Sequence, residues 1–377
     1  MKIKVFYEFC VELESLWKAL EPVSSHYIFQ SYEWLRFWQE TIGQQTLGMT
    51  PWVMVVLDAS GQPRMTFPFG VRKQLKIRIL EFLGGGQGDY QGPLIHNEWV
   101  CNLPAIQSAW LLVQKQLPKH DVQHFMKLPA VWGAQANPML HVWPSRFQDH
   151  AYSLSLPQSF EEFQNKQRKK IRADSNRQRR RLTEMGYLAF EMLDGNAGMW
   201  QGALDVMIGQ KRDRYRSTGV PDIFSDAAVQ RFYRELPQIA TEGRVHCAIL
   251  RLNDEIVATH WGAVYQNRFY YLMPTITNGP LRSYSPGRLL LEDLVEWSIA
   301  QRLSLFDFTI GGEEYKRDWC DGEMALFEHL RIATPFGFPY LGYIRLRRRV
   351  RKSSRVWNVV KFLYSGLRYG IHSAKKI

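Results

Sequence analysis

The side chains best suited to chemistry lie in two short stretches of the second half of the chain. The first, Ser285-Pro286-Gly287-Arg288, precedes an apolar run and has the composition of a helix start. Ser285 is a suitable cap, Gly287 lets the backbone approach a ligand closely, and the unpaired amides of a helix start carry partial positive charge. We therefore expect Ser285, Gly287 and Arg288 to bind an anionic group; an ordinary capped helix start is the alternative.

The second stretch brings several titratable groups together after an apolar segment. Asp307, a candidate catalytic residue, ends a predicted strand, and the loop after it contains Glu313, Tyr315, Lys316 and Trp319. Glu313 is a candidate general base, Tyr315 can donate the proton of its hydroxyl, and Lys316 and Trp319 are candidate substrate contacts. The alternative is a structural cluster in which the carboxylates pair with neighbouring cations.

Two further positions are candidates. His260 lies in a predicted strand, where a neutral imidazole can accept a proton from an amine or hydroxyl, and it is our first candidate for the base. A hydrogen-bonded core histidine is the alternative. Asp89 and Tyr90 follow a cluster of glycines and are expected to form a wall of an acceptor pocket, unless the glycines serve only a tight loop.

Metal and nucleophile motifs are weak. His120 and His124 are four residues apart, but no third ligand or adjacent glutamate completes a zinc motif. Signatures of serine hydrolases and of phosphate-binding loops are missing. We therefore expect chemistry without a metal ion.

Composition favours a folded cytoplasmic protein. The chain has 377 residues, of which 45% are hydrophobic, and its four cysteines form no C-x-x-C pair. The start lacks the apolar core of a signal peptide, and no apolar run approaches the roughly 18 residues of a membrane span. The net charge of +12 is concentrated in residues 341–377, which contain 11 Lys or Arg and no Asp or Glu.

The elements that must position these residues alternate between strands and helices, which predicts an α/β fold. Residues 52–57 and 64–71 form a predicted hairpin, and a similar arrangement from residue 247 suggests two related halves. In the second half we expect helices at about 160–185, 198–217 and 226–240, strands at 244–252, 255–265 and 268–274, a helix from 287 and a strand at 303–310. The expected domains are 1–150, 151–335 and a basic tail, 336–377.

Several short sequences resemble a known family when taken in order. They are Gln30-Ser-Tyr-Glu-Trp-Leu, Leu83-Gly-Gly-Gly with Asp89-Tyr90, the basic segment Arg168–Leu182, Tyr284-Ser-Pro-Gly-Arg-Leu-Leu, and Asp307-Phe-x-x-Gly-x-Glu-x-Tyr-Lys-x-x-Trp. Together they resemble the CelD/BcsL family of GNAT-like acyltransferases, and the layout is similar to that of the FemABX aminoacyltransferases. The resemblance implies two tandem GNAT-like domains with mixed central sheets flanked by helices.

The same resemblance implies an activity. It is the transfer of an acetyl group from acetyl-CoA to an amine or hydroxyl of a sugar or an envelope polysaccharide precursor. One departure matters, because Tyr284 and Leu289 stand where GNAT proteins usually have Arg or Gln and Gly or Ala. A FemABX-like aminoacyl transfer from charged tRNA is therefore an alternative. A third possibility is a non-catalytic protein that holds a glycan or a lipid-linked intermediate at the membrane.

Two basic segments indicate anionic partners. Residues 166–181 contain nine Lys or Arg and one Asp, a density that favours the phosphates of CoA, tRNA or a lipid diphosphate, with a solvated helix face as the alternative. The tail mixes basic and apolar residues and is expected to attach to the anionic inner face of the membrane, unless it packs on the protein itself.

Overall fold

The computed structural model of the chain describes residues 1–195, 198–239 and 244–352. Its centre is a mixed sheet of thirteen strands with the order β1-β2-β3-β4-β6-β15-β9-β14-β13-β12-β11-β10, and β5 pairs with β3. The strands of the first part are β1 (Lys2–Phe6), β2 (Thr50–Leu57), β3 (Pro63–Gln74), β4 (Ile77–Phe82), β5 (Leu94–Ile95), β6 (Val122–Pro129) and β9 (Ser145–Ser155), with β7 (Val131–Trp132) and β8 (Gln135–Ala136) in a separate ribbon. The others are β10 (Leu188–Asp194), β11 (Arg244–Leu252), β12 (Glu255–Tyr265), β13 (Arg268–Ile276), β14 (Leu305–Ile310) and β15 (Gly322–Ile332).

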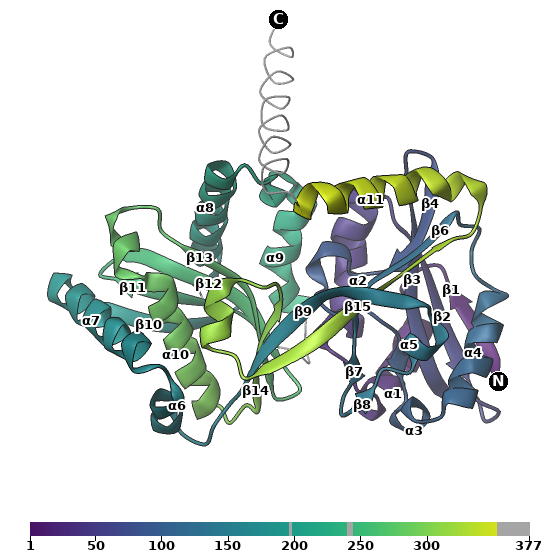
Figure 1. Ribbon diagram of the computed structural model, residues 1–377, viewed down its shortest axis with the longest axis horizontal. Helices are drawn as coiled ribbons and strands as arrows, with labels where there is room; N and C mark the ends of the chain where they lie inside the picture. The colour runs from purple at the N-terminus through teal and green to yellow at the C-terminus, as the bar shows by residue number, and fades with distance from the viewer. Residues whose placement is uncertain (196–197, 240–243, 353–377) are drawn as a thin grey trace, which may run out of the picture.

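Helices cover both faces of this sheet, so the predicted α/β class is confirmed (Figure 1). They are α1 (Val11–Leu20), α2 (Tyr32–Trp38), α3 (Asn97–Val100), α4 (Leu103–Gln114), α5 (Met139–Val142), α6 (Phe160–Lys166), α7 (Lys169–Met185), α8 (Trp200–Thr218), α9 (Ala227–Ile239), α10 (Pro286–Ala300) and α11 (Phe338–Lys352). The helices and strands expected for the second half are confirmed, with a break between α6 and α7.

The two parts of the chain share the sheet. Strand β15 comes from the second part, yet it lies between β6 and β9 and is antiparallel to both. Residue 150 lies within β9, so the sheet continues across the expected boundary, and the division into two domains stays a prediction.

Alternation along β12 assigns the helices of the second part to opposite faces of the sheet. Trp261 and Ala263 belong to the core that includes buried residues of α8, whereas Ala258 and Val264 belong to the core that includes buried residues of α10. Because side chains alternate along a strand, each face receives its own helix layer. Figure 1 shows α7 and α10 on one side and α8 and α9 on the other.

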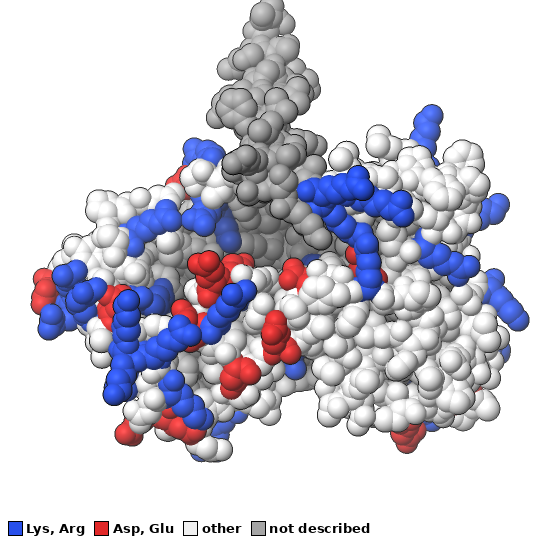
Figure 2. Space-filling model, in the orientation of Figure 1, with Lys and Arg blue, Asp and Glu red and all other residues white. Residues whose placement is uncertain are grey.

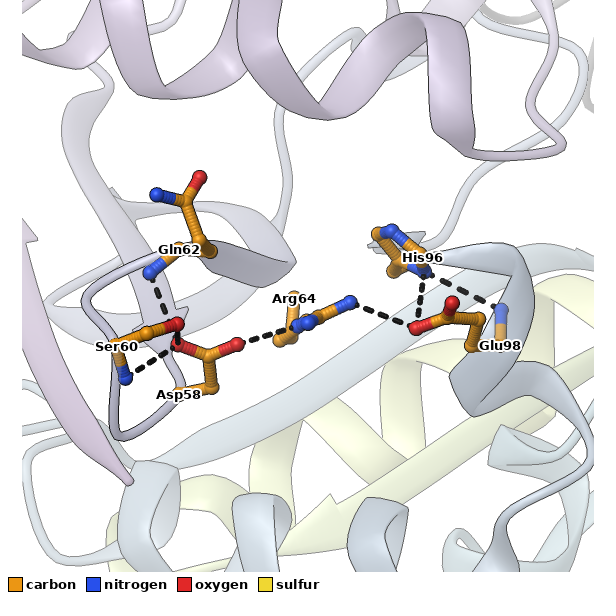
Figure 3. Close-up of polar contacts among 6 residues, drawn as sticks. All are labelled: Asp58, Ser60, Gln62, Arg64, His96 and Glu98. Atoms are coloured by element: carbon orange, nitrogen blue, oxygen red, sulfur yellow. Dashed lines mark hydrogen bonds and ion pairs between the residues drawn. The ribbon is translucent and has the colours of Figure 1, made fainter.

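The predicted hairpin of β2 and β3 is confirmed, and a polar network closes its turn (Figure 3). The Asp58 carboxylate accepts hydrogen bonds from the Ser60 and Gln62 amides and from Arg64 Nε, the last at 2.7 Å. Arg64 also contacts Glu98 at 2.9 Å. The hydrogen bonds from Ser60 and Arg64 hold the pKa of Asp58 well below its usual range.

The parallel pairing of β13 with β14 ends early, and this shapes the site. It covers only Arg268–Tyr270 and Leu305–Asp307, although β13 continues to Ile276 and β14 to Ile310. A register shift between Trp261 and Gly262 also bends the β12–β13 pair. The two strands therefore separate, and the edge of β13 faces open space.

The end of the chain is partly described. Helix α11 packs through Tyr340 and Ile344 on Ile79 and Val122 of the sheet. The rest of the expected tail, residues 353–377, lies outside the described residues. Within the described part of the chain, no helix is both long enough and apolar enough to cross a membrane.

Candidate functional site

A cavity of about 420 Å³ lies where β13 and β14 separate, between α8 and the start of α10. Its lining residues are Gln210, Lys211, Arg214, Tyr271, Pro274, Thr275, Ile276, Asn278, Arg282, Gly287, Arg288, Leu291, Glu313, Tyr315 and Trp319. The helix start and the acidic loop singled out in the sequence thus share one cavity. All of these residues belong to the second half of the chain.

The cavity is predominantly cationic. Lys211, Arg214, Arg282 and Arg288 line it, against the single carboxylate of Glu313. Burial lowers the pKa of Lys211 to about 8, and the nearby Arg214 charge acts in the same direction. Charging the Lys211 amine is costly because it is buried near other cations. An anion bound in the cavity would offset this cost.

Arg288 is held at the rim by α7. Its guanidinium forms an ion pair with Asp174, while its buried Nε has no hydrogen-bond partner among the described residues. A buried donor without a partner is costly, so a ligand acceptor would satisfy it.

The start of α10 differs from the expected cap. Ser285 has the left-handed backbone conformation (φ 54°), and its side chain makes no capping hydrogen bond, so the expected side-chain cap is wrong. Its carbonyl instead accepts the amides of Arg288 at 3.0 Å and Leu289 at 3.3 Å. A Cβ at Gly287 would lie 2.7 Å from Cγ2 of Ile276, so glycine is required here by close packing of α10 on β13.

The loop after β14 presents an acid and a phenol to the cavity. Glu313 Oε2 lies 2.9 Å from Nζ of Lys316, which also donates to the carbonyls of Phe308 and Ile310 at 2.9 and 3.2 Å. Lys316 is therefore a buried anchor of the loop. Burial raises the pKa of Tyr315, as does the neighbouring Glu313, and both effects keep the phenol protonated.

Trp319 contributes an aromatic wall. It lines the cavity at the end of the 3₁₀ turn η7 (Glu314–Asp318), and it stacks on Phe163 of α6 with 5.9 Å between the ring centroids. This contact ties the loop to the helix layer that contains α10.

His260 does not line the cavity. It is fully buried and stacks on Tyr271, whose ring is parallel to it with centroids 4.5 Å apart. Its Nε2 accepts the Leu272 amide at 3.2 Å, and burial, together with the charges of His246 and Lys211, holds its pKa well below the usual range. A general base must contact the acceptor, and His260 does not reach the cavity. The predicted role of His260 as the base is therefore not supported by its position.

Asp307 and Tyr90 contact each other outside the cationic cavity. The Tyr90 hydroxyl donates to Asp307 at 2.8 Å, and Arg268 pairs with the same carboxylate at 3.0 Å. These residues line a second, smaller cavity of about 210 Å³. Asp89 instead pairs with Lys127 at 3.3 Å. The candidates from the first half therefore do not share the cationic cavity.

The basic segment forms α6 and α7, and part of its charge is neutralised within the fold. Arg179 pairs with Asp293 at 2.7 Å and Arg168 with Asp318 at 2.5 Å. Lys169 and Lys170 are exposed. Figure 2 shows the basic side chains gathered over α6 and α7. The helix thus combines structural ion pairs with an exposed basic surface.

The expected absence of a metal motif concerns His120 and His124. His124 lies in β6 and contacts Glu328 and Tyr340 at 2.5 and 2.8 Å, so the pair does not share a helix. The described ranges contain no group of three or more His, Cys, Asp or Glu that could hold a metal ion.

Sequence reasoning missed the contribution of α8. Gln210, Lys211 and Arg214 have the spacing of one helix face, but other charged residues follow in the same helix and obscure that face. Only the position of α8 beside the separated strands shows that these side chains line the same cavity as Glu313.

The chain is similar in sequence or in fold to several known proteins. Residues 168–317 match the model of the acetyltransferase (GNAT) domain. The crystal structure of FemX has a TM-score of 0.58 with 10% identity, covering 86% of this chain and 97% of FemX. A conserved protein of unknown function from Bacteroides thetaiotaomicron VPI-5482 has a TM-score of 0.53 with 11% identity, covering 87% of this chain and 99% of that one.

L-PGS from Bacillus licheniformis has a TM-score of 0.52 with 11% identity, covering 90% of this chain and 97% of L-PGS. A search of curated proteins finds no match to this chain. Membership of the CelD/BcsL family stays a prediction. The matched GNAT domain contains most of the residues around the cationic cavity, and the chain has the fold of GNAT-type acyltransferases.

Proposed function

We propose that the protein transfers an acyl group from acyl-CoA, with acetyl-CoA as the first candidate, to an amine or hydroxyl of a sugar or polysaccharide precursor. The observation that carries the proposal is the cationic cavity at the separated strands, with Glu313 and Tyr315 at its wall. The match of residues 168–317 to the acetyltransferase (GNAT) domain supports it.

The residues around the cavity suit a phosphate-bearing acyl donor. Lys211, Arg214, Arg282 and Arg288 provide positive charge, and Arg288 Nε is a buried donor without a partner in the described structure. Beyond Tyr270, β13 has no parallel neighbour among the described strands, and this edge can pair with amides of an extended ligand. When bound, acyl-CoA supplies a thioester as the activated acyl group.

Glu313 and Tyr315 have complementary roles in this proposal. Glu313 takes the proton of the attacking amine or hydroxyl as the new C–N or C–O bond forms. Tyr315 gives its proton to the departing thiolate as the C–S bond breaks, since its raised pKa keeps the hydroxyl protonated beforehand. Lys316 keeps the Glu313 carboxylate in place.

The test combines titration calorimetry with turnover. We expect acetyl-CoA to bind the wild-type protein, and we expect Glu313→Gln to lower kcat by about 10²- to 10⁴-fold with little change in donor affinity. Glu314→Gln is the matched control, because Glu314 is exposed, adjacent in sequence and outside the cavity lining. Unchanged turnover in both Glu313→Gln and Tyr315→Phe would remove these residues from the mechanism.

Aminoacyl transfer from charged tRNA is the second candidate. It is favoured by the exposed Lys169 and Lys170 at the start of α7 and by Tyr284 and Leu289 at the departures from the usual GNAT pattern. The overall fold is also similar to that of FemX. Co-purified RNA whose binding falls steeply with salt, together with no calorimetric signal for acetyl-CoA, would favour this reading.

A further inference from the structure

An exposed apolar patch lies where the β3–β4 hairpin meets the turn η8 (Pro335–Gly337) and α11, and it shares no residue with the lining of the cationic cavity. It comprises the tip of the β3–β4 hairpin, the turn η8 and the outer side of α11. The patch residues and their exposed fractions are Leu75 90%, Phe336 75%, Leu346 63%, Phe338 62% and Tyr343 46%. Figure 1 shows the hairpin beside α11 along one edge of the molecule.

The hairpin and the helix border a common groove. Leu75, Phe336, Pro339 and Tyr343 line a hollow of about 680 Å³ between them. The buried side of α11, with Tyr340 and Ile344, already holds the helix on the sheet. The outer apolar side chains are therefore not needed to keep α11 in place.

The hairpin tip has an unusual sequence for its backbone. Leu75 and Lys76 both have positive φ, at 49° and 68°, where tight hairpin turns favour Asn and Gly. A leucine in this conformation is strained, and at 90% exposure it gains almost no burial in return. Strain and exposure at one residue are typical of a contact with something outside the chain.

The rim of the patch is basic. Residues 73–78 and 333–349 contain seven Lys or Arg and no Asp or Glu. Arg78 pairs with Asp121 at 2.9 Å and Arg348 pairs with Glu328 at 2.5 Å. The other five, which are exposed, are Lys73, Lys76, Arg345, Arg347 and Arg349. Figure 2 shows basic side chains along α11.

We propose that this patch docks the protein on an anionic lipid surface, with Leu75, Phe336 and Phe338 entering the headgroup layer and the basic rim facing lipid phosphates. Exposed apolar side chains surrounded by cations are the combination that binds such surfaces from one side. Every charged residue within 73–78 and 333–349 is basic, which fits lipid phosphates better than the apolar face of a protein partner. The proposal does not depend on the proposed activity.

Flotation of the full chain with vesicles tests the proposal. We expect binding to vesicles of equal parts phosphatidylcholine and phosphatidylglycerol, weak binding to phosphatidylcholine alone, and loss of binding as salt rises. Leu75→Ser with Phe336→Ser should lower partitioning by at least about tenfold. Arg345→Gln with Arg349→Gln should lower it about 25-fold, because each near-surface cation contributes about fivefold.

Matched controls use exposed residues elsewhere. Leu111→Ser with Tyr187→Ser removes side chains that are 60% and 75% exposed, and Arg180→Gln with Arg181→Gln removes two cations of α7. The apolar control should bind as the wild type does, and the charge control should lose less than the patch variant. All variants should keep the wild-type circular dichroism, since the replaced side chains are exposed.

Several outcomes would overturn the proposal. They are a wild-type chain that does not bind anionic vesicles, a Leu75/Phe336 variant that binds as the wild type does, and an apolar control that loses as much binding as the patch variant. Self-association in light scattering that the patch variant abolishes, without vesicle binding, would assign the patch to a second copy of the chain instead.

Discussion

Lys211 allows the electrostatics of the cavity to be measured without a ligand. Burial lowers its pKa from 10.5 to about 8, which is equivalent to about 3 kcal/mol of free energy. The folded state therefore binds a proton at Lys211 less readily than the unfolded chain does. Between pH 8 and pH 10.5 the unfolded chain holds more protons, so this contribution to the free energy of unfolding rises with pH across that window.

Replacing Lys211 with Met should remove this penalty while keeping a similar side-chain volume. We expect Lys211→Met to raise the free energy of unfolding by up to about 3 kcal/mol at pH 7, and by less than about 1 kcal/mol at pH 10. Urea unfolding of both proteins at the two pH values measures the difference. Lys170→Met, at an exposed position, should leave the free energy of unfolding close to that of the wild type.

The comparison of the two pH values can contradict the assigned cause of the Lys211 pKa shift. If Lys211→Met shifts stability equally at pH 7 and pH 10, the burial of the Lys211 charge is not the cause. The same charge has a functional consequence, because an anion in the cavity favours the protonated amine. Binding of acetyl-CoA at pH 8 to 9 should therefore take up protons in the wild type and fewer in Lys211→Met, as measured by calorimetry in buffers of different ionisation enthalpy.

Three other predictions concern the surroundings of the cavity. Asp307→Ala should lower the free energy of unfolding by about 3 kcal/mol in urea, because it leaves the charge of Arg268 without its partner; a loss no larger than that of a surface substitution would contradict the pairing. Gly287→Ala should cost about 1 to 3 kcal/mol, since its Cβ would overlap the neighbouring strand, and a neutral effect on thermal unfolding would show that α10 can shift. His260 stays neutral in the folded state, so its contribution to stability falls as pH drops through about 6.5, where the unfolded chain takes up the proton. His260→Phe should keep the stacking on Tyr271, weaken that acid destabilisation and leave turnover intact; loss of turnover would restore His260 as the base.

Local sequence determined most of the secondary structure of the second half and the β2–β3 hairpin of the first. The apolar alternation of β11–β13, the Pro286 start of α10 and the turn at Asp58–Pro63 are short-range signals, and the structure contains each element where the pattern predicts it. The α/β class followed from their order. Polar residues after β14 also marked Glu313 and Tyr315 as candidates, because a loop that follows a buried strand is a common place for functional side chains.

Tertiary structure decided which candidates meet. His260 and Tyr271 lie on paired strands and their rings stack, but only Tyr271 lines the cavity, while His260 is fully buried behind it. Asp307 is close to Glu313 in sequence but does not line the cationic cavity, and its carboxylate instead accepts a hydrogen bond from Tyr90. Lys211 enters the site from α8 because β13 and β14 separate beside that helix. The separation of two strands depends on tertiary packing and cannot be predicted from the local sequence of either strand.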